Sequence, residues 1–128
     1  MGQYGEAAKI AAGLMSKKPN TNPVDAWQDA VAQECHSESS KKKSCPKGAF
    51  LGLCEEGWVS GCIPGIYTRS VKNKEYVIRA ANILLENPKL ATDGYNLWKL
   101  VIDGEKKKSN EQMDVVISLF KEGYLKEP

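Results

Sequence analysis

The sequence lacks several features that would assign it to a function class at once. Its 128 residues carry a formal net charge of only +2, from 18 basic and 16 acidic side chains. This balance is far from the excess of a protein that coats DNA, so any anion binding must be local. No stretch approaches the roughly 18 consecutive apolar residues of a membrane span, and we expect no membrane partner. Residues 1–15 lack the charged-then-apolar layout of a secretory signal, which favours a cytoplasmic protein.

Catalytic and nucleotide-binding motifs are also absent. The chain contains no phosphate loop, dinucleotide fingerprint, zinc-protease helix or serine-nucleophile elbow. It has one histidine, His36, and four cysteines, Cys35, Cys45, Cys54 and Cys62, separated by nine, eight and seven residues. Zinc sites usually pair their ligands at roughly two to four intervening residues. We therefore expect reduced thiols, no metal and no cofactor, and the missing motifs argue against an enzyme.

Helical periodicity is the main positive signal. The composition, 41% hydrophobic and 27% charged, is that of a globular protein, and the length suits one domain. Apolar residues recur three to four positions apart in six segments, which predicts an all-α bundle of about six helices. Residues 1–21 should form a short peripheral helix and a linker, and residues 22–125 the core, with an ordered Gly/Pro-rich loop at 57–70. The predicted core residues are Trp27, Phe50, Leu53, Val77, Leu84, Trp98, Val116 and Phe120.

Capping residues place the helix starts. Asn22 followed by Pro23 is typical of a helix N-terminus. Ser44 or Cys45 should cap the third helix, whereas Ser109 should open the last helix as part of a capping box. Residues 37–44, which are mainly Ser, Glu and Lys, should form a solvated loop.

Two glycines, Gly48 and Gly52, lie inside the predicted third helix. Glycine in a helix interior costs about 1 kcal/mol relative to alanine, so a neighbouring backbone or a ligand must come close there. Close helix packing is the commoner cause.

The tetrapeptide Lys-Lys-Lys-Ser occurs twice, at residues 41–44 and 106–109, each time before a predicted helix. A helix N-terminus presents unpaired N–H groups and the positive end of the macrodipole, so lysines arriving there favour phosphate or carboxylate. We therefore expect a binding module for an anionic macromolecule, with nucleic acid as the favoured partner. The candidate anion-binding residues are Lys41, Lys42, Lys43, Ser44, Lys47, Arg69, Lys106, Lys107, Lys108 and Ser109.

Three alternatives stay open. Cys45 lies in electropositive surroundings that favour a thiolate, and His36 or a nearby carboxylate would assist it in a small enzyme. A protein-binding module would instead use a patch formed by Trp58 and Tyr67. Solvated lysine loops that bind nothing are the third alternative. Lysine clusters that converge on one face would favour nucleic-acid binding. A pocket at Cys45 would favour an enzyme, and an exposed aromatic patch would favour a protein partner.

Residues 44–57, which read SCPKGAFLGLCEEG, resemble the central motif of an uncharacterised family of small bacterial proteins. The resemblance extends more weakly through residues 73–76, 97–98 and 112–116, and so covers most of the chain from Trp27 onward. That family has no assigned function, ligand or catalytic residue. The resemblance therefore implies a relationship and no activity.

Overall fold

Helices account for nearly all of the regular structure. The computed structural model describes residues 2–18 and 20–128 and is 66% helical, without a strand in that part of the chain. The elements are α1 (Gln3–Lys17), α2 (Pro23–Glu34), α3 (Glu38–Lys41), α4 (Ser44–Glu55), α5 (Val71–Glu86), the 3-10 helix η1 (Pro88–Thr92), α6 (Gly94–Ile102) and α7 (Gln112–Lys121). The predicted all-α bundle is confirmed. Among these elements, none combines the length and the apolar composition that a bilayer-spanning helix requires.

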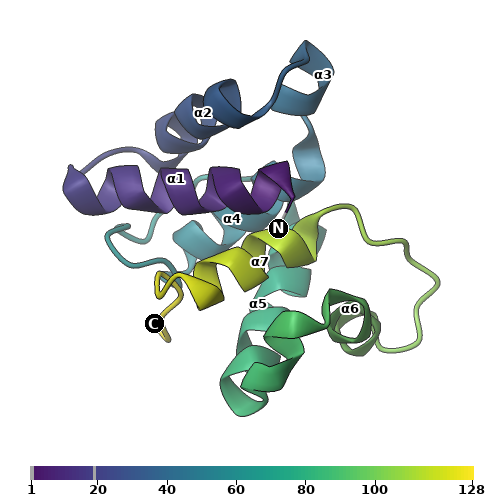
Figure 1. Ribbon diagram of the computed structural model, residues 1–128. Coiled ribbons are helices and arrows are strands. Elements are labelled where there is room, and N and C mark those ends of the chain that lie inside the picture. The colour runs from purple at the N-terminus through teal and green to yellow at the C-terminus, as the bar shows by residue number, and fades with distance from the viewer. Residues whose placement is uncertain (1, 19) are drawn as a thin grey trace.

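The N-terminal helix α1 is part of the core. It packs against α2 and α7 (Figure 1), and Ser118 of α7 donates a hydrogen bond of 2.6 Å to the Gly5 carbonyl. Small side chains allow neighbouring helices to approach closely. The buried residues of α1 are Tyr4, Gly5, Ala7, Ala8, Ala11, Ala12 and Met15. The expectation of a short, peripheral first helix is therefore wrong, because its alanine-rich face forms a packing seam.

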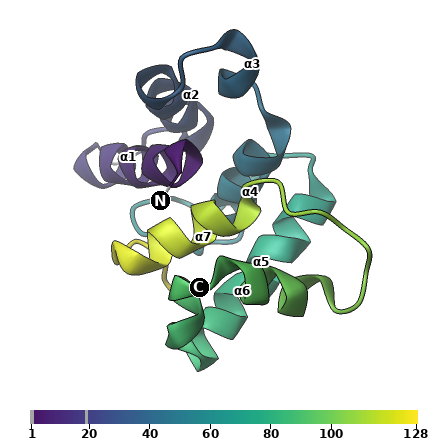
Figure 2. The same ribbon diagram turned by 45° about the vertical axis from the view of Figure 1, so that its right-hand side comes forward.

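Helices α4 and α5 approach each other at the two glycines of α4. A Cβ atom added at Gly48 would lie 2.9 Å from the Cβ atom of Ser70, and one added at Gly52 would lie 2.9 Å from the Cα atom of Lys74. The expectation of close helix packing is confirmed. Figure 2 shows α4, α5 and α7 meeting in the middle of the molecule, where the contacts among these three helices form much of the core.

Seven of the eight predicted core residues are buried; they are Trp27, Phe50, Leu53, Val77, Leu84, Trp98 and Val116. Phe120 is only half-buried, whereas its neighbour Leu119 is fully buried. Helix α7 contacts α1, α4 and α5, so it is buried on most sides. Phe120 lies in the last turn, where this enclosure ends. The prediction that Phe120 belongs to the core is therefore wrong in degree, because the side chain is only partly covered there.

The Gly/Pro-rich segment after α4 is the ordered loop that the sequence predicts. The Ser60 amide donates to the Tyr124 carbonyl at 2.8 Å, and the Lys126 amide donates to the Trp58 carbonyl at 2.8 Å. The C-terminal segment thus pairs with the loop and holds it against the helices. Trp58 is buried in this arrangement, at 5% exposure, and cannot form a surface patch with Tyr67.

Candidate nucleic-acid interface

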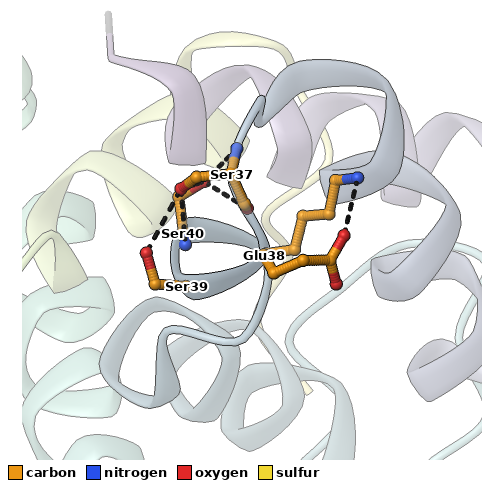
Figure 3. A network of polar contacts seen from close by, with 5 residues as sticks. Ser37, Glu38, Ser39 and Ser40 are labelled. Carbon is orange, nitrogen blue, oxygen red and sulfur yellow. Dashed lines mark hydrogen bonds and ion pairs between the residues drawn. The ribbon is translucent and has the colours of Figure 1, made fainter.

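The first lysine run begins in a helical turn, α3, where the sequence predicts a solvated loop. Ser37 and Ser40 form a reciprocal capping box: the Ser40 amide donates to the Ser37 hydroxyl at 3.1 Å, and the Ser37 amide donates to the Ser40 hydroxyl at 3.3 Å (Figure 3). Tyr4 of α1 donates from its hydroxyl to the Ser40 carbonyl at 2.8 Å. These bonds satisfy the backbone locally and join the turn to α1. The expectation of a solvated loop is wrong because Ser37 and Ser40 cap a helical turn.

The three lysines of this run have different surroundings. Lys41 forms an ion pair of 3.4 Å with Glu38, and the Lys43 ammonium lies 5.5 Å from the ring centre of Tyr4. Lys42 is exposed and forms no ion pair with the described residues. Of the first run, Lys42 is therefore the lysine most available to a ligand.

A basic pocket of about 350 Å³ lies beside the first turn of α4. Its lining includes Lys42, Ser44 and Lys47 from the α4 side, and Arg69 and Ser70 from the segment before α5. Lys47 and Arg69 form no ion pair with another described residue. Three cations and four hydroxyl-bearing side chains around one hollow form a site with donors suited to phosphate oxygens.

Glu55, at the end of α4, holds the segment that carries Arg69. Its Oε1 atom accepts hydrogen bonds from the backbone amides of Tyr67 at 2.8 Å and Thr68 at 3.2 Å. This carboxylate fixes the path of the loop just before the exposed Arg69. Glu55 therefore acts on the pocket by position and not by contact with a ligand.

The second lysine run lies in the loop between α6 and α7. Helix α7 begins at Gln112 after Glu111, whose φ is 75°, so Ser109 does not cap it. The loop backbone is held at two points: the Trp98 indole donates to the Lys107 carbonyl at 3.0 Å, and the Asn110 amide donates to the Gln112 side chain at 2.6 Å. The predicted capping box is wrong because this left-handed backbone turn separates the lysines from the helix.

The second run nevertheless reaches the start of α4. Lys107, Lys108 and Ser109 line a hollow of about 380 Å³ together with Cys45, the second residue of α4. In Figures 1 and 2 this loop projects beyond α6 and returns to the start of α7, which lies beside the first turns of α4. The two runs, 65 positions apart in the sequence, therefore flank the same helical turn. Lys106 is exposed and lines neither hollow.

Acidic side chains are also present near this surface. The pKa of Glu111 is raised, mainly by burial and further by a hydrogen bond with Asp114, while Lys43 acts in the opposite direction. A raised pKa means that the site disfavours the ionised Glu111 carboxylate. Lys43 therefore lies beside two acidic side chains, Glu111 and Asp114.

The Cys45–His36 pair receives no geometric support. Cys45 is partly exposed and lines the second hollow, but His36 is exposed on the chain between α2 and α3, and no hydrogen bond joins the two among the described residues. The remaining side chains of the hollow are lysine, serine and amides.

The other three thiols belong to the core. Cys35, Cys54 and Cys62 are buried, and all four cysteines are free. Burial raises the pKa of Cys35 and of Cys54, whereas a hydrogen bond with Cys54 lowers that of Cys62. Within residues 2–18 and 20–128, no group of three or more His, Cys, Asp or Glu side chains is arranged to hold a metal ion.

A third hollow, of about 270 Å³, was not anticipated from the sequence. Trp27 and Val31 of α2 contribute its apolar surface, and Lys42 and Lys47 again belong to its lining. The sequence marks Trp27 only as a core residue. Its proximity to the lysines depends on the packing of α2 beside α3 and α4, for which the sequence carries no local signal.

Comparison with known proteins places the chain in a family. A family model described as Family of unknown function (DUF6979) matches residues 1–126. The chain belongs to this family. The match includes α1 as well as the segments on which the sequence resemblance rests. No curated protein and no solved structure matches the chain significantly.

Proposed function

We propose that the surface around the first turn of α4 binds the phosphates of nucleic acid. The observation that carries this proposal is the convergence of the two Lys-Lys-Lys-Ser runs. Lys42 and Lys47 with Arg69 lie on one side of this turn, and Lys107 and Lys108 lie on the other. Convergence on one turn distinguishes an anion-binding surface from lysines scattered to keep a protein soluble.

The N-terminal end of α4 also attracts phosphate. Its N-cap residue, Lys43, makes no side-chain capping bond, and its first turn contains no acidic residue. The free amides of this turn and the positive end of the macrodipole therefore act in the same direction as the lysines. Backbone amides and Lys or Arg side chains together are the usual donors to nucleic-acid phosphates.

The number of available cations predicts modest affinity with strong salt dependence. Each phosphate neutralised on DNA contributes about −0.7 to −0.9 to the slope of log K against log salt. If all five cations, Lys42, Lys47, Arg69, Lys107 and Lys108, neutralise a phosphate, the slope is about −3.5 to −4.5. The net charge of +2 limits non-specific attraction elsewhere on the surface.

Fluorescence anisotropy with labelled DNA and RNA at low salt tests this proposal. The double variants Lys42→Ala/Lys47→Ala and Lys107→Ala/Lys108→Ala should each weaken binding and reduce the salt slope by about 1 to 2. The double variant Lys17→Ala/Lys18→Ala, at the C-terminal end of α1, removes the same amount of charge and serves as the control. An equal loss of affinity in the control would mean that binding depends on the net charge of the protein and not on this surface. No binding of any nucleic acid would overturn the proposal.

A further inference from the structure

The basic pocket beside the first turn of α4 gathers cations from two segments and has no acidic side chain in its lining. Lys42 and Lys47 come from the α4 side, and Arg69 comes from the segment before α5. Lys42 and Arg69 are exposed, so a ligand can reach their charged groups. The full lining is Lys42, Ser44, Lys47, Gly48, Leu51, Tyr67, Thr68, Arg69 and Ser70. This hollow of about 350 Å³ is referred to below as the Arg69 pocket.

A chain of hydrogen bonds sets the role of the Ser70 hydroxyl in the Arg69 pocket. The Asn110 amide can only donate, and it donates to Oε1 of Gln112 at 2.6 Å. Nε2 of Gln112 therefore donates to Oδ1 of Asn73 at 3.0 Å, and Nδ2 of Asn73 donates to the Ser70 hydroxyl oxygen at 2.7 Å. Ser70 is the acceptor in this last bond, so its own proton is left for another acceptor.

The protein holds a second hydroxyl of the pocket in the same way. The Ser70 amide donates to the Thr68 hydroxyl oxygen at 3.1 Å. Within residues 2–18 and 20–128, neither hydroxyl donates a hydrogen bond to a protein acceptor. A Cβ atom added at Gly48 would lie 3.0 Å from the Ser70 hydroxyl oxygen, so the missing side chain leaves this hydroxyl room. The Arg69 pocket therefore offers both hydroxyl and cationic donors to one group that is rich in acceptors.

A phosphate at the end of a strand matches this pocket better than a phosphate within a strand. A phosphomonoester carries a charge of about −1.5 to −2 at pH 7 and presents three strong acceptor oxygens. A phosphate within a strand carries a single charge and continues into a sugar on both sides. Three cations without an acid around one hollow provide the larger compensation that only the phosphomonoester needs.

We propose that the Arg69 pocket binds the terminal phosphate of a nucleic-acid strand and that Ser70 donates its hydroxyl proton to that phosphate. This inference rests on the proposed function and specifies which part of the nucleic acid the surface recognises. The next phosphates of the strand cross the first turn of α4 toward Lys107 and Lys108, which line the second hollow. Asn110 and Gln112 line that hollow too, so the hydrogen-bond chain to Ser70 connects the two halves of the surface.

The first experiment compares internally labelled 12-nucleotide strands of one sequence by fluorescence anisotropy. The strands carry no terminal phosphate, a 5′-phosphate or a 3′-phosphate. At least one phosphorylated strand should bind about tenfold more tightly than the unphosphorylated strand, because one additional charge-assisted hydrogen bond is sufficient for that ratio. An unphosphorylated strand two nucleotides longer gains a similar charge through diesters and should bind nearly as the 12-nucleotide strand does.

The outcomes separate this inference from the proposed function. Equal binding of the three 12-nucleotide strands would overturn the terminal-phosphate assignment and leave the proposed function intact. An equal gain in the longer strand would do the same, because charge alone would then explain the preference. Absence of binding by every strand would overturn both.

A matched set of variants tests the location. Arg69 forms no ion pair with another described residue, so Arg69→Gln should remove the charge without disturbing the fold. Arg69→Gln and Ser70→Ala should each remove most of the preference for the phosphorylated strand. Lys107→Ala/Lys108→Ala should weaken binding of both strands and keep the preference, because these lysines line the other hollow. Retention of the preference in either single variant, or its loss in the double variant, would overturn the assignment.

Competition by adenosine 5′-monophosphate distinguishes the end of a strand from a free phosphomonoester. This nucleotide should displace the phosphorylated strand, but with lower affinity than an unlabelled copy of that strand, because it has no further phosphates to reach Lys107 and Lys108. Equal affinities of the nucleotide and the strand would mean that the pocket binds a small phosphomonoester, and would overturn the assignment to a strand end.

Discussion

The ammonium group of Lys74 lies 2.7 Å from Oε2 of Glu55 and 3.0 Å from Oε1 of Glu56. One α5 lysine thus bridges two adjacent carboxylates at the C-terminal end of α4, directly beside the helix contact at Gly52. The Lys74 hydrogen bond, followed by the Tyr67 and Thr68 amides, lowers the pKa of Glu55 from its ordinary value of 4.5. This carboxylate therefore links α4, α5 and the loop between them.

Replacing Glu55 by glutamine should destabilise the protein by about 1–2 kcal/mol at pH 7. Because the pKa of Glu55 is lowered in the folded protein, its contribution is present above the unfolded value of 4.5 and is lost as the pH falls through the lowered pKa. Urea unfolding of both proteins between pH 7 and pH 2 should show the difference shrinking on the acid side. Glu56→Gln, whose carboxylate is more exposed, should have a smaller effect. A difference that stays constant with pH would contradict the role assigned to Glu55.

Gly52→Ala should destabilise the α4–α5 contact by about 1–3 kcal/mol because the added methyl group overlaps the Lys74 backbone. Gly13→Ala is the control, since a Cβ atom there meets only the Tyr124 hydroxyl at 3.4 Å. That change should be neutral or stabilising by up to about 1 kcal/mol, as the helix propensities predict. Thermal and urea unfolding measure both. If both variants changed the free energy of unfolding in the same direction, packing would not constrain Gly52.

Phe50→Ala should cost about 3–5 kcal/mol because Phe50 is completely buried and stacked on Trp27. Phe120→Ala should cost only about 1–2 kcal/mol, since Phe120 is half-buried in the last turn of α7. Urea unfolding monitored by circular dichroism gives both values. Equal losses would mean that Phe120 is enclosed as fully as Phe50.

One thiol should react rapidly with a disulfide reagent in the native protein, and it should be Cys45. Cys35, Cys54 and Cys62 are buried, at 2%, 0% and 7% exposure, so access limits all three, including Cys62 with its lowered pKa. Cys45→Ser should abolish the fast phase, and four thiols should react in denaturant. Two fast thiols, or fewer than four in denaturant, would contradict this assignment.

Helix positions follow largely from local residues in the sequence. Asn22 accepts the Val24 amide at 2.8 Å and Pro23 opens α2, as the sequence predicts. Gly48 and Gly52 lie in a tight helix contact because glycine inside a helix needs a neighbour to offset its cost. Each of these features depends on a few adjacent residues.

The candidate site depends on packing and was predictable only in part. The two lysine runs are evident in the sequence. The convergence of residues 41–47 with residues 106–109 is not, because it arises from the contacts of α4, α5 and α7. The buried Gln112 is an example of such a contact. Its side chain accepts a hydrogen bond from the Asn110 amide and donates one of 3.0 Å to Asn73, and so connects the second lysine run to α5. A polar residue in a helical pattern gives no sign of such a role.

The contact between α1 and α7 also has a consequence for synthesis. Gly5 and Ser118, joined by a hydrogen bond, are separated by 113 positions. At about 5–20 residues per second, Gly5 is synthesised roughly 6–23 s before its partner Ser118. During that interval the alanine-rich face of α1 has only α2 to cover it. The last cooperative step of folding must therefore await the C-terminal end of the chain, and nascent chains arrested before α7 should remain sensitive to protease within α1.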